Sequence, residues 1–116
     1  LRTFFGEGNA WRLVPNYFGG YPWEKKVLEV LERESPINYV QNITTPYIMF
    51  HGENDLRTGV IQSEQMFKSL KVLGRPVEYV RHPGATHEIT RSGNNRQRID
   101  QMLRTWEFFE RWVSSR

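Results

Sequence analysis

The sequence contains no cysteine among its 116 residues, so disulfide bonds and thiolate metal sites are excluded. No apolar run approaches the ~18 residues that a membrane-spanning helix needs. The first residues also lack the apolar core of a secretory signal peptide. We therefore expect a cytoplasmic protein without a membrane partner. The chain does not begin with Met, and we expect it to be a piece of a longer protein.

Acidic residues are slightly outnumbered, 13 against 16 Lys and Arg, which gives a formal net charge of +3. A basic chain can bind nucleic acid when its positive charges gather on one surface. Here they are scattered, and the arginines of the last third alternate with Glu107 and Glu110, which is typical of a solvated helix face. We therefore expect no nucleic-acid partner. Aromatic residues make up 14% of the chain and favour a packed core over disorder.

Two strand-and-helix units are predicted in the second half of the chain. Residues 47–50 form an apolar run without polar alternation, as in a strand buried on both faces, and residues 76–81 predict a second strand. A helix is expected over residues 60–73, with Gly74 just beyond its end, where a positive φ is favoured. A last helix of four turns or more is predicted by one apolar stripe, formed by Ile99, Met102, Leu103, Trp106, Phe109 and Val113.

The first third of the chain is less regular. Residues 1–22 are rich in Gly and other turn formers and predict a loop that lies on a surface. Residues 23–34 predict a helix that begins behind Pro22 and ends at Ser35, because the residue before a proline avoids the helical region. One further turn is expected over residues 36–40.

This order of elements indicates an α/β fold with parallel strands and flanking helices. Two parallel strands make a poor sheet, since parallel sheets are covered on both faces and have neighbours on both sides. We therefore expect an incomplete sheet that belongs to a larger one.

An acid and a histidine follow the two predicted strands. Asp55 comes after the first strand and His87 after the second, where open α/β sheets bind their ligands. This is the order of acid and base in the Ser-His-Asp triad of an α/β-hydrolase, in which the acid orients the histidine and the histidine acts as general base. Two simpler readings stay open: Asp55 caps a turn or the next helix, and His87 is a surface residue.

The other histidines are weaker candidates. His51 is expected to pack under the loop of Asp55, and His82 to end the second strand. A metal site built from His51, Glu53, Asp55 and His87 is conceivable by residue type, but no short His-x-His or His-x-x-x-His spacing supports it. We expect neither a metal nor a cofactor.

A nucleophilic serine is missing. A triad serine of this fold occupies a sharp turn of the form Gly-x-Ser-x-Gly, and the sequence contains no such segment. The serines present are Ser35, Ser63, Ser69, Ser92, Ser114 and Ser115. None has the expected turn and chain order.

Several segments together resemble one family of serine peptidases. Phe18-Gly-Gly-Tyr-Pro-Trp-Glu24, His51-Gly-Glu-Asn-Asp-Leu-Arg57 and Pro83-Gly-Ala-Thr-His87 are similar, in the same order, to segments of the prolyl oligopeptidase family in its acylaminoacyl-peptidase-like branch. The resemblance extends over essentially the whole chain. One departure is Thr58-Gly59, where many relatives have Val-Pro. We expect it to alter the turn into the helix without contacting Asp55 or His87.

The resemblance implies that residues 1–116 are the C-terminal part of an α/β-hydrolase catalytic domain, with Asp55 and His87 as triad members. It implies a peptidase that hydrolyses short peptides or acylated N-terminal residues. The nucleophile would lie in the missing N-terminal part of the same protein, so this chain alone is expected to be inactive and to self-associate through surfaces left uncovered. The alternatives are an esterase or carboxylesterase-like hydrolase on the same fold, and a non-catalytic binding or assembly module.

Overall fold

Strand β1 (Tyr47–Gly52) and strand β2 (Val77–His82) pair in parallel, from Tyr47 opposite Val77 to Gly52 opposite His82. The computed structural model describes residues 1–113, apart from the side chain of Arg2. Within this part the two strands form the only sheet. The expected α/β class, parallel pair and incomplete sheet are confirmed.

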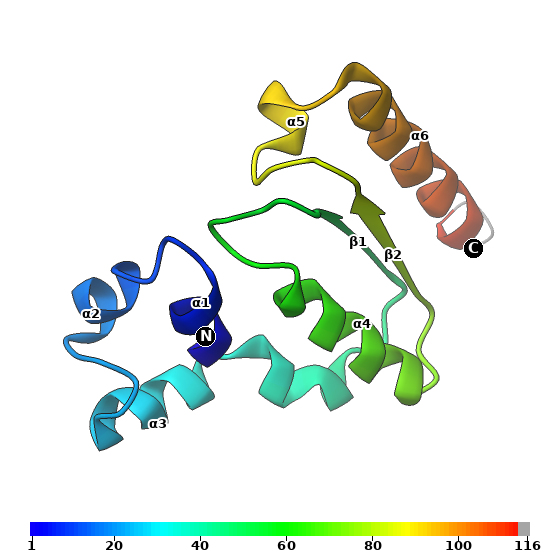
Figure 1. Ribbon diagram of the computed structural model, residues 1–116. Helices are drawn as coiled ribbons and strands as arrows, with labels where there is room; N and C mark the ends of the chain where they lie inside the picture. Colours follow the sequence, from blue (N-terminus) through cyan, green and yellow to red (C-terminus); the bar gives the residue numbers. More distant parts are fainter. Residues whose placement is uncertain (114–116) are drawn as a thin grey trace.

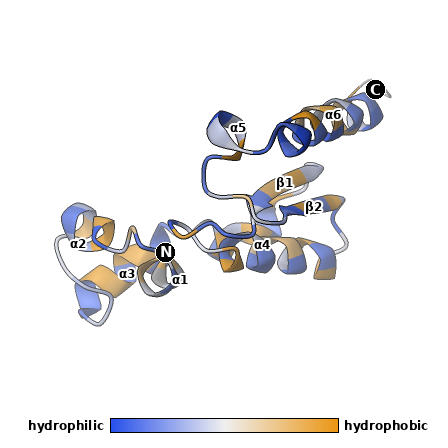
Figure 2. Ribbon diagram, turned by 45° about the horizontal axis from the view of Figure 1, so that its top comes forward, coloured by the Kyte–Doolittle hydropathy of each residue, from blue (hydrophilic) through white to orange (hydrophobic). Residues whose placement is uncertain are grey.

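Helices cover both faces of the sheet. Helix α4 (Ile61–Val72) connects the strands and lies on one face, while helix α6 (Asn95–Trp112) lies on the other. Figure 2 shows the strands between these two helices. Gly74 follows α4 with a φ of 73°, as expected from its place beyond the helix end.

Successive residues of β2 point to opposite layers. The ring of Tyr79 lies 5.5 Å from that of Phe67 in α4, whereas the carboxylate of Glu78 forms an ion pair of 2.9 Å with Arg111 in α6. This is the two-residue alternation of a strand with a layer on each side.

The loop expected over residues 1–22 is a wrong prediction. Two short helices occur there, α1 (Arg2–Glu7) and α2 (Leu13–Phe18). Each has six residues, which is too short to show a helical period. Pro15 does not disrupt α2, because it lies in the first turn, where backbone N–H groups have no helical partner.

These helices form a separate lobe with helix α3 (Lys25–Arg33). Its core is a cluster of three buried residues, Val14, Val27 and Leu31. The helix expected over residues 23–34 is thus present. The turn expected after Ser35 is a 3₁₀ helix, η1 (Pro36–Asn42).

The expected last helix is present, but its apolar stripe is exposed. Helix α6 has 18 residues and follows the short helix α5 (Ile89–Ser92). Phe108, which is 5% exposed, is its buried residue. The six residues of the predicted stripe are 53–72% exposed, so the described part of the chain leaves more than half of each one uncovered.

Candidate active site

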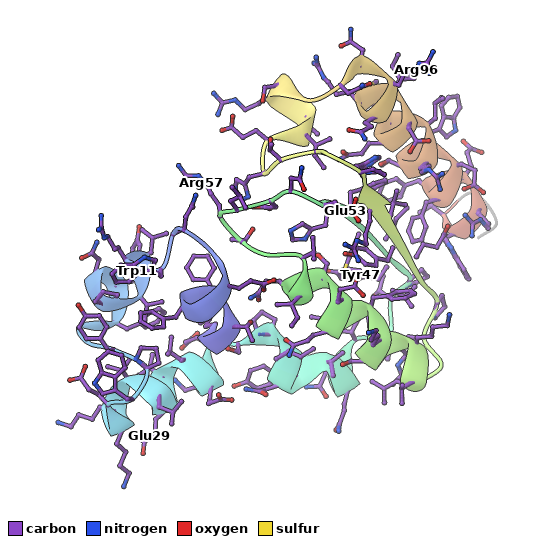
Figure 3. All side chains as sticks on the ribbon, viewed as in Figure 1. Trp11, Glu29, Tyr47, Glu53, Arg57 and Arg96 are labelled. Carbon is purple, nitrogen blue, oxygen red and sulfur yellow. The ribbon has the colours of Figure 1, made fainter. Side chains whose placement is uncertain are left out.

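The loops after β1 and β2 meet at the carboxyl edge of the sheet. The backbone N–H of Glu53 donates to His82 O over 3.0 Å, and that of Asn54 donates to Ala85 O over 2.8 Å. Gly52 permits this approach, since a Cβ there would overlap the carbonyl oxygens of Ala85 and Thr86. Figure 3 shows Glu53 beside the strand ends and Arg57 further along the same loop, near the α1 lobe.

This edge brings Asp55 and His87 together. Nδ1 of His87 lies 3.0 Å from Oδ2 of Asp55, across 32 positions of sequence. A carboxylate only accepts, so Nδ1 carries the proton and Nε2 of the neutral ring keeps its lone pair. The His87 side chain is 45% exposed, and no described residue hydrogen-bonds its Nε2. The arrangement is an oriented imidazole with its basic nitrogen accessible.

The other carboxylate oxygen of Asp55 holds its own loop. Oδ1 accepts hydrogen bonds of 2.9 Å from the backbone N–H groups of Arg57 and Thr58. Asp55 therefore caps the turn, as one of the two readings expected, and contacts His87 at the same time. The residue is only 8% exposed.

Hydrogen bonding keeps this buried acid ionised. Burial alone raises the pKa of Asp55, but the bonds from Thr58, His87 and Arg57 outweigh it and hold that pKa below its usual value of 3.8. Asp55 is therefore a carboxylate at neutral pH. An anion at this position stabilises a protonated His87.

The side chain of Thr58 contacts both Asp55 and His87. Its hydroxyl donates to Oδ2 of Asp55 over 3.1 Å and lies 3.4 Å from Nδ1 of His87. The expectation that the Thr58-Gly59 departure contacts neither residue was wrong. A threonine three positions after an aspartate is a local capping pattern, and that spacing is the signal that could have found it.

His51 packs under the Asp55 loop, as expected. It is the penultimate residue of β1, and its side chain is 10% exposed. Its Nε2 lies 3.1 Å from Oδ2 of Asp55. This second histidine contact to the same oxygen was not predicted, because it depends on how the turn after β1 folds back.

His82 takes no part in the pair. It is the last residue of β2 and 3% exposed, and its ring stacks on Phe50 with centroids 5.9 Å apart.

Within residues 1–113, no group of three or more His, Asp and Glu side chains is placed to hold a metal ion. None of the described helices is long and apolar enough to cross a membrane.

None of the described serines forms a hydrogen bond with His87. Ser35 bonds to Leu31 O, Ser63 to His51, and Ser92 to Glu88 O, while Ser69 lies within α4. Ser114 and Ser115 are outside the described residues.

A cavity of about 210 Å³ opens at the Asp55–His87 pair, lined by Phe50, His51, Gly52, Asp55, Thr58, His87 and Ile89.

The chain is similar in sequence to known peptidases. The model of the prolyl oligopeptidase family matches residues 5–116. A Bacillus subtilis protein described as the uncharacterized peptidase YuxL is 37% identical over 89 residues, which cover 74% of this chain and 14% of the relative. The chain therefore spans about one seventh of that protein's length.

The fold is found in solved peptidase structures. The uncomplexed acylaminoacyl peptidase of Pyrococcus horikoshii superposes with a TM-score of 0.84 at 26% identity, over 97% of this chain and 18% of the other. An acylaminoacyl peptidase in complex with Z-Gly-Gly-Phe-chloromethyl ketone gives a TM-score of 0.83 at 26% identity, over 96% of this chain and 18% of that one. The fold is thus part of an α/β-hydrolase, and the chain belongs to the prolyl oligopeptidase family.

Proposed function

We propose that this chain supplies the acid and the base of a serine peptidase. Asp55 orients His87, and the nucleophilic serine comes from another part of a longer protein, of which residues 1–116 form the C-terminal portion of the catalytic domain. The observation that carries the proposal is the 3.0 Å contact between Asp55 Oδ2 and His87 Nδ1 at the carboxyl edge of a parallel sheet.

The geometry suits general acid–base catalysis. Nε2 of His87 accepts the proton of the serine hydroxyl as its oxygen attacks the peptide carbonyl carbon. His87 then gives that proton to the leaving amine, which departs and leaves an acyl-enzyme. Water, deprotonated by the same nitrogen, hydrolyses the acyl-enzyme. Asp55 remains ionised throughout and stabilises the imidazolium, and the mechanism uses no cofactor or metal.

The proposed substrates are short peptides or peptides with acylated N-terminal residues. Similarity to acylaminoacyl peptidases supports this class, as does the peptide-like chloromethyl ketone bound to one of them. We place the protein in the cytoplasm, with the rest of its own chain as the structural partner. An aminoacyl anilide and an aryl ester with the same acyl side chain distinguish a peptidase from an esterase.

Two variants of the longer protein test the catalytic roles. Asp55→Asn should lower kcat by roughly 10⁴ and His87→Ala by roughly 10⁶, while Ser92→Ala in helix α5 should leave kcat unchanged. An Asp55→Asn enzyme with unchanged kcat would show that the acid is another residue.

Residues 1–116 alone should not hydrolyse these substrates, because the chain has no Gly-x-Ser-x-Gly turn. The check is labelling with a serine-directed fluorophosphonate, followed by peptide mapping. A labelled serine in this chain, including Ser63 beside His51, would contradict the assignment of the nucleophile to another segment.

A further inference from the structure

His51 connects helix α4 with the loop that carries Asp55. Its Nδ1 lies 2.7 Å from the hydroxyl oxygen of Ser63, near the start of α4. Its Nε2 lies 3.1 Å from Oδ2 of Asp55 and 2.8 Å from the carbonyl oxygen of Thr58. Both nitrogens of this buried ring are therefore in contact with polar partners.

The partners determine which nitrogen carries the proton. A carboxylate oxygen and a backbone carbonyl oxygen both accept hydrogen bonds and donate none, so Nε2 between them must be the N–H donor. In the neutral ring Nδ1 then accepts from the hydroxyl of Ser63. The hydrogen bonds thus run in one direction, from Ser63 to His51 and from His51 to the carbonyl oxygen of Thr58, and Oδ2 of Asp55 lies 3.1 Å from the same Nε2.

Oδ2 of Asp55 has three polar neighbours: the hydroxyl of Thr58 and Nδ1 of His87 donate hydrogen bonds to it, and Nε2 of His51 lies beside it. His51, Thr58 and His87 approach it at 3.0–3.1 Å, while Oδ1 is held by two backbone N–H groups. Rotation of the carboxylate would break bonds on both oxygens. Of these three neighbours, His51 is the one held in turn by a side chain from helix α4, that of Ser63.

We propose that His51 is a positioning residue, anchored by Ser63, that holds the carboxylate of Asp55 in the orientation required by His87. His51 acts through Asp55, since its ring is 10% exposed and its polar contacts are all within the chain. The inference rests on the proposed function, because positioning matters only if the Asp55–His87 pair is used. It adds helix α4 to the elements that determine the geometry of the pair.

Imidazole NMR on the ¹⁵N-labelled chain tests the proposal without requiring turnover. Two- and three-bond ¹H–¹⁵N couplings at neutral pH report the tautomer of each histidine. His51 should be in the Nε2–H form and His87 in the Nδ1–H form. His51→Leu, which removes the hydrogen bond to Thr58 O and the polar contact to Oδ2 of Asp55, should lower the ratio of Nδ1–H to Nε2–H tautomers at His87 roughly tenfold, as expected for loss of one polar contact to a charged group.

Three further variants make the result specific. His51→Gln keeps an N–H donor and should preserve the His87 ratio better than His51→Leu does. His82→Leu removes another buried histidine from the same edge of the sheet and should leave the ratio unchanged. Asp55→Asn should shift the His87 tautomer whether or not His51 contributes.

Each outcome decides a separate point. If Asp55→Asn shifts the His87 tautomer and His51→Leu does not, the positioning role is wrong and the proposed function stands. If Asp55→Asn has no effect, the acid role of Asp55 fails first. Should circular dichroism show that both His51 variants unfold, the unaltered chain decides, since an Nδ1–H tautomer at His51 would overturn the proposal and an Nε2–H tautomer would support it.

Discussion

Thr58 binds Asp55 twice, through its backbone N–H to Oδ1 and through its hydroxyl to Oδ2. One residue therefore fixes both oxygens of the acid. The hydroxyl is the side-chain part of this contact and can be removed without disturbing the backbone bond.

Thr58→Val should destabilise the fold by about 1 kcal/mol, the usual contribution of one hydrogen bond. Val matches Thr in shape but has no hydroxyl, and the backbone bond to Asp55 remains. Thr58→Ser is the matched control, because it keeps the hydroxyl. Urea unfolding measures the free-energy difference, and a Thr58→Val chain as stable as the original would show that the hydroxyl does not contribute.

The depressed pKa of Asp55 predicts a loss of stability in acid. The folded-state pKa lies below the ordinary value of 3.8, so the unfolded chain binds a proton more readily than the folded one. The stabilisation is complete above the unfolded-state pKa and is lost as the pH falls through the folded-state pKa.

As the pH falls below 3.8, the free energy of unfolding should therefore decrease less in Asp55→Asn than in the unaltered chain. Urea midpoints measured across this range provide the comparison. Asp100→Asn is the control, because Asp100 forms an exposed ion pair with Arg104, and such pairs contribute little. Identical acid profiles for Asp55→Asn and the unaltered chain would contradict the assigned shift.

Gly52→Ala should separate the two loops of the site. The added Cβ would meet backbone carbonyl oxygens of Ala85 and Thr86, which cannot rotate away as a flexible side chain can. We expect a loss of roughly 1–3 kcal/mol in stability, as for other overpacked sites, and a weaker Asp55–His87 contact in the NMR experiment.

Gly6→Ala is the matched control for this substitution. Gly6 lies within α1, and a Cβ there would meet no atom within 4 Å, so alanine should stabilise the helix by roughly 0.5–1 kcal/mol. Thermal unfolding distinguishes the two signs. A Gly52→Ala chain as stable as the original would show that the loops can separate at no cost.

The exposed stripe of α6 predicts self-association of this chain. Its six apolar residues are 53–72% exposed, and contiguous apolar patches on soluble chains favour contact with another surface. Sedimentation velocity over a concentration series should show dimers or larger species.

Trp106→Glu should shift this distribution towards monomer. Trp23→Glu is the matched control, because Trp23 is similarly exposed, at 72% against 63%, but lies outside the helix α6 stripe. A monomer at every concentration would rule out self-association, and equal effects of the two substitutions would place the contact elsewhere.

Hydrophobic period was sufficient to predict the long elements. Strand β1 carries a continuous apolar run, and strand β2 and helices α4 and α6 have polar and apolar residues on different sides, so the positions of these four elements were predicted within a few residues. Helices α1 and α2 were missed because six residues span fewer than two turns. The exposure of Trp106 and its neighbours was not predicted, since a periodic stripe does not identify what covers it.

Within the site, the sequence predicted the proximity of Asp55 and His87 but not the contacts of His51 and Thr58. Asp55 and His87 follow two parallel strands, and the ends of such strands share one edge of a sheet, so their proximity follows from topology. The contacts of His51 and Thr58 depend on how the β1 turn folds back onto the carboxylate. No pattern of apolar residues encodes that path.

The register of the two strands sets the distance scale of the acid–base pair. Gly52 faces His82 at the last paired position, and the loops of Asp55 and His87 begin there. A slip of one residue would move one loop along the strand by ~3.3 Å and turn its side chains to the other face. That step exceeds the 3.0 Å separation of Oδ2 and Nδ1. Only the observed register of the two strands therefore brings the acid and the base into contact.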